Sequence, residues 1–230
     1  MSRLGLGVLA SGRGSNLVAI MDAIDEGRLS ARVLVVVSDQ ENAPALARAR
    51  ERGVEAIALP RSRFRSREDH DNAIASILVE RGVDLVVLAG YMRILSKAFI
   101  KRFEGRIMNI HPALLPSFPG LNAQAQALSY GVKVSGCTVH FVDEGVDTGP
   151  IILQRAVPVL EDDTPETLAE RILRQEHEIY PEAIQLFAEG RLVIEGRRVR
   201  IRAPRGAPDG GPPGVPCDGN SCIRQGCTKG

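Results

Sequence analysis

The sequence predicts an α/β protein with a doubly wound, mostly parallel sheet and helices on both faces. Short apolar runs alternate with helix-like stretches through most of the chain, as in βαβ units. The early runs are apolar at nearly every position, which indicates strands buried on both faces. Gly27, Gly53 and Gly82 directly follow the first three helix-like stretches, where glycine is a common helix terminator.

The first half of the chain contains the clearest elements. The predicted strands are residues 4–10, 32–37, 55–59 and 84–89. The predicted helices between them are residues 17–26, 43–52 and 66–81. This regular alternation places the first strands in parallel and requires crossover helices on both sides of the sheet.

The second half begins with a strand at 106–111 and a loop interrupted by three prolines. A helix at 123–130 and strands at 135–142 and 150–157 follow, and their order in the sheet is left open. A long helix begins near Thr164, since Pro165 and Glu166 suit a helix start; Pro181 is expected to interrupt it before Gly190. A hairpin of residues 192–194 and 199–201 closes the domain.

We therefore expect one domain at residues 1–201 and a tail at 202–230. The tail contains seven Gly and five Pro but no Leu and no aromatic residue. Such a composition cannot bury enough apolar surface to offset the entropy of ordering, so the tail is expected to be disordered.

Composition excludes several classes of function. The 230 residues include 29 basic and 28 acidic side chains, for a net charge of +1, which argues against nucleic-acid or membrane partners. No apolar run reaches the ~20 residues of a membrane helix, and a cytoplasmic location is expected. Three of the four Cys lie in the tail and no His pair has zinc-ligand spacing, so neither a disulfide framework nor a metal is predicted.

A glycine-rich turn at residues 11–16 follows the first strand and opens a helix, which is a favourable place for an anion. A Walker loop requires Lys where Arg13 stands. A dinucleotide fingerprint requires a small residue where Leu17 stands, although Asp39 is placed like a ribose-binding acid. The remaining interpretations are a monophosphate site formed by Gly14, Ser15 and Asn16, or a purely structural turn.

Asn109 and His111 end a predicted strand and lie on the same face of it, at the edge of the sheet where ligands bind in open α/β folds. The alternative is a His that bonds to a loop carbonyl. An acidic loop at 143–150 supplies a carboxylate that could keep His111 charged, or is only a solvated connection. The other His residues receive no functional role: His140 lies within a strand and His70 is expected on a helix surface.

Several segments together resemble the phosphoribosylglycinamide formyltransferases. They are residues 12–16, 88–95, 109–116, 136–142 and 147–150, and the resemblance extends from residue 1 to about 201. It implies a formyltransferase-like, Rossmann-related fold and formyl transfer to glycinamide ribonucleotide in de novo purine biosynthesis. The implied cosubstrate is 10-formyltetrahydrofolate, without a metal. The expected partners are these small molecules, in a monomer or homodimer.

The resemblance also implies roles for individual residues. The implied catalytic residues are Asn109, His111 and Asp147. The implied substrate-binding residues are Gly14, Ser15, Asn16, Leu173, Arg174, Gln175 and Glu176. The implied folate-binding residues are Arg67, Met92, Arg93, Ile94, Leu95, Asn109, Asp143, Glu144, Gly145, Val146 and Asp147.

The chain departs from the family pattern at three positions, Asn122, Ala125 and Leu173, which border the expected substrate region. Two alternatives to the transferase remain. One is a formyltetrahydrofolate hydrolase, in which water replaces the amine. The other is a catalytically silent nucleotide-binding module.

Overall fold

The structure is a computed structural model that describes residues 3–204, so most of the tail predicted at 202–230 lies outside the described residues. Its strands are β1 (Leu4–Leu9), β2 (Ala31–Ser38), β3 (Glu55–Ala58), β4 (Leu85–Leu88), β5 (Ile107–His111), β6 (Val134–Phe141), β7 (Ile151–Pro158), β8 (Leu192–Glu195) and β9 (Arg198–Ile201). Its helices are α1 (Ser15–Asp25), α2 (Pro44–Glu51), α3 (Arg67–Glu80), α4 (Lys97–Arg102), α5 (Ala123–Tyr130) and α6 (Pro165–Ala188), with a 3₁₀ turn η1 (Arg61–Arg63).

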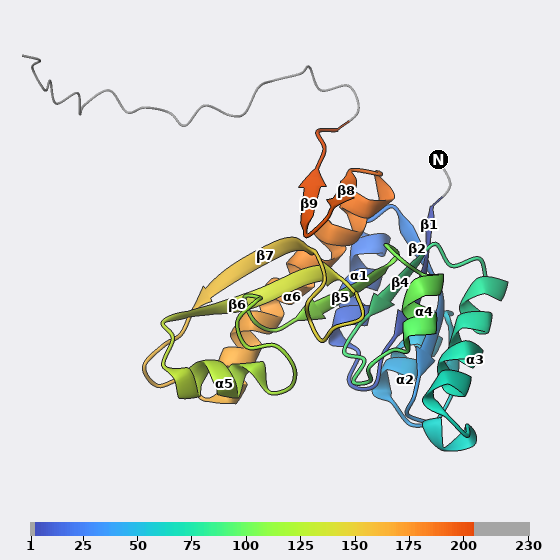
Figure 1. Ribbon diagram of the computed structural model, residues 1–230, viewed down its shortest axis with the longest axis horizontal. Helices are drawn as coiled ribbons and strands as arrows, with labels where there is room; N and C mark the ends of the chain where they lie inside the picture. Colours follow the sequence, from blue (N-terminus) through green and yellow to red (C-terminus); the bar gives the residue numbers. More distant parts are fainter. Residues whose placement is uncertain (1–2, 205–230) are drawn as a thin grey trace, which may run out of the picture.

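Within residues 3–204 the strands form one sheet in the order β3-β2-β1-β4-β5-β6-β7-β9-β8 (Figure 1). The first five strands are all parallel, which confirms the predicted doubly wound, mostly parallel class. The strand order that the sequence left open places β6 antiparallel to β5, with Asn109 opposite His140, and β7 antiparallel to β6. The carboxyl ends of β1, β4 and β5 therefore meet at one edge.

Helices cover both faces of the sheet, as the uniformly apolar strands predict. On one face, buried residues of α1, α2 and α6, including Leu17, Leu46 and Ile172, pack against the sheet. On the other face, Ile74 of α3 and Phe99 of α4 do the same (Figure 1). Burial on both faces explains why the central strands show no polar alternation.

Helix α6 corrects one prediction, because it continues through Pro181 as one helix of 24 residues. A proline inside a helix costs about 3 kcal/mol relative to alanine. Its neighbours Ile179, Tyr180 and Ile184 are completely buried, and the Tyr180 hydroxyl bonds to the carbonyls of Leu88 and Met108 at 3.0 and 2.9 Å. Packing on both sides of the proline therefore outweighs the missing hydrogen bond.

Two further features differ from expectation. Helix α4 is absent from the predicted elements, because it has only six residues. The sequence signal for its start is Ser96, whose hydroxyl accepts a hydrogen bond from Phe99 N at 3.3 Å. His70, expected on a helix surface, is completely buried and bonds through Nε2 to the Leu59 carbonyl at 2.8 Å. Among the described helices, none is both long and apolar enough to span a membrane.

Candidate active site

The three predicted catalytic side chains meet at the carboxyl edge of the sheet. Asn109 and His111 extend from the last residues of β5, and Asp147 comes from the loop between β6 and β7. The two carboxylate oxygens of Asp147 face different partners. Oδ2 lies 3.3 Å from His111 Nδ1, and Oδ1 lies 3.4 Å from Asn109 Nδ2.

Both ring nitrogens of His111 face acceptors. Nδ1 faces the Asp147 carboxylate, and Nε2 lies 2.8 Å from the carbonyl oxygen of Phe118. Only the doubly protonated ring donates to both partners. The two interpretations of His111 from the sequence, a His paired with an acid and a His bonded to a loop carbonyl, are therefore both present.

Asp147 is held in a specific conformation and ionisation state. Its backbone is left-handed, with φ of 53°, and its Oδ2 accepts a hydrogen bond from Gly120 N at 2.8 Å. Burial alone would raise the pKa of this carboxyl. Hydrogen bonding to the carboxylate, including that from the Gly120 N–H, and the charge of His111 outweigh burial and lower the pKa below its usual value.

The proline-containing loop at 112–122 is fastened to the same residues. His111 bonds to the Phe118 carbonyl and Asp147 to the Gly120 amide. At the start of the loop, Thr138 of β6 accepts from Leu115 N at 3.0 Å and donates to the Ala113 carbonyl at 2.6 Å. His111, Asp147 and Thr138 of β6 therefore position this loop together.

His140 is the polar residue that sequence reasoning missed here. It lies opposite Asn109 in the sheet, with Nε2 at 3.2 Å from Asn109 Nδ2 and 3.6 Å from Asp147 Oδ1. A histidine within an apolar strand carries no functional signal by itself. The signal would have been the pairing of β6 with β5, which the sequence left open.

The predicted phosphate loop lies between β1 and α1. Gly14 precedes α1 in a left-handed conformation with φ of 72°, and a Cβ on it would lie 2.7 Å from the Ala45 Cβ, so glycine is required. α1 begins at Ser15, so its first N–H groups are free of intrahelical partners. Ser11 of the same loop accepts a hydrogen bond from Met92 N at 3.0 Å, which joins this loop to the predicted folate segment.

The structure brings part of the segment at 173–176 to this loop. Asn16 Nδ2 donates to Glu176 Oε2 at 2.8 Å, although 160 positions separate the two residues. Burial raises the pKa of Glu176, and the hydrogen bond from Asn16 opposes that shift only in part. On the same helix Arg174 is exposed, whereas Leu173 and Gln175 are half-buried.

The predicted folate segments show a mixture of exposed and anchored side chains. Met92, Ile94 and Val146 are large apolar side chains with exposed fractions of 70%, 60% and 48%. Leu95, in contrast, is buried in the core, so it anchors the segment. Exposed apolar side chains of this size suit the flat face of an aromatic ligand.

The charged members of the folate set mostly have protein partners. Arg67 is the first residue of α3, after the Ser66 cap, and is exposed. Arg93 lies 3.8 Å from Asp39, the acid that the sequence placed like a ribose ligand. Glu144 pairs with Lys97 at 2.8 Å, and Asp143 accepts from Thr148 Oγ1 at 2.6 Å and from Gly145 N at 3.1 Å.

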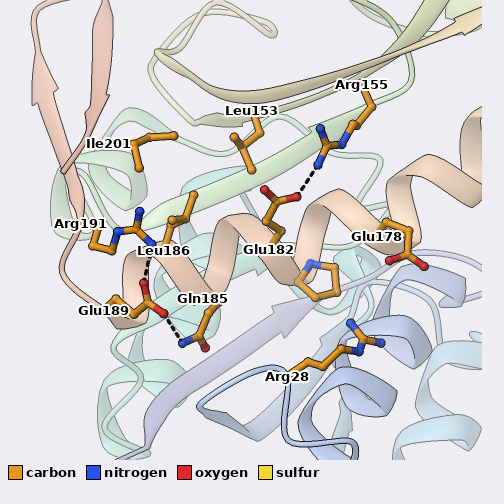
Figure 2. Close-up of a pocket in the computed structure, with 11 residues that line it drawn as sticks. Arg28, Leu153, Arg155, Glu178, Glu182, Gln185, Leu186, Glu189, Arg191 and Ile201 are labelled. Atoms are coloured by element: carbon orange, nitrogen blue, oxygen red, sulfur yellow. Dashed lines mark hydrogen bonds and ion pairs between the residues drawn. The ribbon is translucent and has the colours of Figure 1, made fainter. Parts of the chain in front are cut away.

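A cavity of about 590 Å³ lies elsewhere, between α6, β7 and the hairpin β8–β9 (Figure 2). The predicted site residues do not line it. Among the charges that line it, Arg155 pairs with Glu182 at 2.8 Å and Arg191 with Glu189 at 2.9 Å. The candidate active site is therefore the edge of the sheet and not this cavity.

The family model for formyl transferases matches residues 6–184. The chain belongs to the formyl transferase family. Within this family it is 43% identical to phosphoribosylglycinamide formyltransferase of Escherichia coli over 203 residues, which are 88% of this chain and 96% of that protein. It is 48% identical to the human trifunctional purine biosynthetic protein adenosine-3 over 183 residues. That match covers 80% of this chain and only 18% of the human protein.

Solved structures of formyl transferases agree with this fold. Glycinamide ribonucleotide transformylase 1 from Symbiobacterium toebii superposes with a TM-score of 0.87 at 60% identity, covering 88% of this chain and 95% of that one. A formyltetrahydrofolate deformylase from Pseudomonas syringae superposes with a TM-score of 0.81 at 24% identity and covers 87% of this chain and 66% of that one. The deformylase therefore shares the fold.

Proposed function

We propose that this chain transfers the formyl group of 10-formyltetrahydrofolate to the amine of glycinamide ribonucleotide, a step of de novo purine biosynthesis. The observation that carries the proposal is the cluster of Asn109, His111 and Asp147 at the sheet edge that also bears the phosphate loop. The relative from Escherichia coli, which the match covers over 96% of its length, is named for this reaction.

In the proposed step the neutral amine attacks the formyl carbon and a new C–N bond forms. The bond from that carbon to the folate nitrogen breaks, and the proton lost by the amine passes to the folate nitrogen. A negative charge develops on the formyl oxygen, where Asn109 and protonated His111 donate hydrogen bonds. Asp147 keeps His111 charged and relays the proton through water.

The geometry of His111 adds a condition to this mechanism. Its Nε2 bonds to the Phe118 carbonyl at 2.8 Å. To donate to the formyl oxygen, Nε2 exchanges the Phe118 carbonyl for the substrate. Productive binding therefore requires a shift of the loop at 112–122 relative to His111.

The two substrates occupy opposite sides of the catalytic cluster in this proposal. The phosphate of glycinamide ribonucleotide binds the first N–H groups of α1, at Ser15 and Asn16, and its glycinamide end approaches residues 173–176. The folate ring covers Met92, Ile94 and Val146, and Arg67 attracts the folate carboxylates. All of these groups belong to one chain, so a monomer suffices for the reaction, and a homodimer remains compatible with it.

A formyltetrahydrofolate hydrolase is the second candidate, because a deformylase shares the fold. One absorbance assay of folate product separates the two, run with and without glycinamide ribonucleotide. Product formation that depends on the amine supports the transferase. Equal turnover without the amine identifies a hydrolase, and no turnover in either condition identifies a silent nucleotide-binding module.

A further inference from the structure

The hydrogen-bond partner of one ring nitrogen of His140 determines whether that nitrogen carries a proton. The side chain is buried, with an exposed fraction of 2%, and Nδ1 lies 2.8 Å from the carbonyl oxygen of Phe141. A carbonyl oxygen only accepts hydrogen bonds, so Nδ1 carries a proton. In the neutral ring, Nε2 is then an acceptor with a free lone pair.

The contacts of Asn109 agree with that tautomer independently. Nδ2 of Asn109 lies 3.2 Å from His140 Nε2 and 3.4 Å from Asp147 Oδ1. With the amide turned over, Asn109 Oδ1 would face a lone pair on one side and a carboxylate on the other. His140 Nε2 and Asp147 Oδ1 are 3.6 Å apart, which is longer than a hydrogen bond. Both partners of Asn109 therefore require its nitrogen at this position.

The same distances allow one N–H of Asn109 to serve both acceptors. The three atoms form a nearly equilateral triangle with sides of 3.2, 3.4 and 3.6 Å. At Nδ2 the two acceptors are therefore separated by a much narrower angle than the two N–H bonds of a planar amide, and a single N–H placed between them can donate to both. Asn109 is only half-buried between the buried residues Met108 and Ile110, which leaves its second N–H accessible to a ligand.

We propose that His140 is a positioning residue for the formyl transfer, an inference that rests on the proposed function. Neutral and protonated on Nδ1, it holds the amide nitrogen of Asn109 toward Asp147. The second N–H of Asn109 is thereby aimed at the formyl oxygen as that oxygen becomes negative. His140 itself does not touch the reacting atoms.

The tautomer is tested on the free protein by long-range ¹H–¹⁵N NMR with ¹⁵N-labelled histidine. The chain has four His, and the signals lost in His140→Gln assign those of His140. We expect a protonated Nδ1 and an unprotonated Nε2 at neutral pH. A proton on Nε2 in that spectrum overturns the proposal, whatever reaction the protein catalyses.

Kinetics of two variants test the effect on Asn109. The Gln side chain of His140→Gln carries an acceptor to the position of Nε2, whereas the Asn of His140→Asn ends near Nδ1 and offers none there. Loss of one oxyanion donor costs about 10²–10³ in kcat, so a misaimed donor in His140→Asn should cost about 10- to 100-fold. We expect unchanged KM values for both substrates and near wild-type kcat in His140→Gln. Equal losses of kcat in the two variants contradict the proposal.

His70→Asn is the matched control, because His70 is also buried and also bonds to a carbonyl, that of Leu59. It should lower Tm without changing kcat.

A double-mutant cycle then shows whether His140 acts through Asn109. If His140 acts through Asn109, His140→Asn causes no further loss of kcat in an Asn109→Ala background; the same fold-loss in both backgrounds overturns the proposal. Absence of formyl transfer in the wild type would instead refute the proposed function, while the NMR result still decides the tautomer.

Discussion

Asp147 combines a left-handed backbone, with φ of 53°, and a carboxylate shared between His111 and the Gly120 amide. Asparagine tolerates left-handed conformations well, so Asp147→Asn should keep the backbone geometry of the loop while it removes the charge and replaces one acceptor oxygen by an N–H donor. Acid–base contributions are typically worth about 10²–10⁴ in rate. We expect kcat to fall by that factor while Tm changes little, measured by the folate absorbance assay and thermal unfolding.

Because its neighbours lower the pKa of Asp147, the wild-type carboxylate remains ionised at every pH above its usual value of 3.8. The wild type therefore carries this charge across neutral and mildly acidic pH, and kcat of the two proteins is compared in that range. Asp22→Asn serves as the control, since Asp22 pairs with Arg52 on the surface. Wild-type turnover in Asp147→Asn at pH 7 would remove this residue from the mechanism.

Ser15 offers a test of the phosphate loop that spares the fold. It is the first residue of α1, where an acidic side chain is favourable to the helix but repels a bound phosphate. Ser15→Asp should raise KM for glycinamide ribonucleotide by tenfold or more, about 1.4 kcal/mol, and leave KM for the folate within twofold. Ser15→Ala separates loss of the hydroxyl from added charge. An equal rise in both KM values would show that the loop does not bind the phosphate.

Sequence separation decides which site residues could be predicted. Residues that contact near neighbours in the sequence were predictable, and those that contact distant segments were not. Asn109 and His111 are two positions apart in one strand, so local periodicity places them together. Asp147 belongs to a separate loop, and family resemblance supplied it. His140 lies 31 positions from Asn109, and only the pairing of β5 with β6 brings the two together.

At the scale of helices and strands, local signals located the elements well. α5 begins and ends at the predicted residues, and Ser66 and Thr164 cap α3 and α6 with their side chains. The predicted interruption at Pro181 was wrong because the sequence shows only the missing backbone hydrogen bond. The packing that offsets this loss is tertiary. The burial of Tyr180 and Ile184 depends on strands that no local pattern connects to α6.

Thr138 of β6 is the clearest test of how strands position the loop at 112–122. Its hydroxyl bonds to Leu115 N and to the Ala113 carbonyl, and Gln154 of β7 donates to it at 2.9 Å. Thr138→Val keeps the shape but leaves these buried groups unpaired, at about 1–3 kcal/mol each. We expect a lower free energy of unfolding and faster amide exchange at Leu115, measured by denaturation and hydrogen exchange.

Ser135→Ala is the matched control, because the Ser135 hydroxyl lies in the same strand, is buried, and has no hydrogen-bond partner among the described residues. It should change stability little. Unchanged exchange at Leu115 in Thr138→Val would mean that His111 and Asp147 alone hold the loop.

At the scale of the whole molecule, the sequence predicted the parallel half of the sheet but not the order of the rest. β1 to β5 alternate with helices, so the right-handed crossover restricts their arrangement. β6 and β7 form an antiparallel extension whose position depends on pairing between distant segments. The candidate site lies at this junction, which explains why its outline was predictable and its internal hydrogen bonds were not.

Glu176 links the ionisation of one buried carboxyl to the stability of the whole fold, since it joins α6 to α1 through Asn16 at 2.8 Å. Burial raises its folded pKa above the ordinary 4.5, so the folded state binds this proton more tightly than the unfolded state does. Its ionisation costs no stability below pH 4.5, and the cost grows as the pH rises from there to the folded pKa.

Glu176→Gln keeps an acceptor for Asn16 without the charge. Urea unfolding should therefore show that Glu176→Gln is more stable than the wild type, by an amount that is smallest near pH 4.5 and increases toward pH 8. Glu178→Gln is the control, because Glu178 is exposed on the same helix, and its stability relative to the wild type should show no such trend. A gain for Glu176→Gln that is constant with pH would show that the folded and unfolded states hold this proton equally.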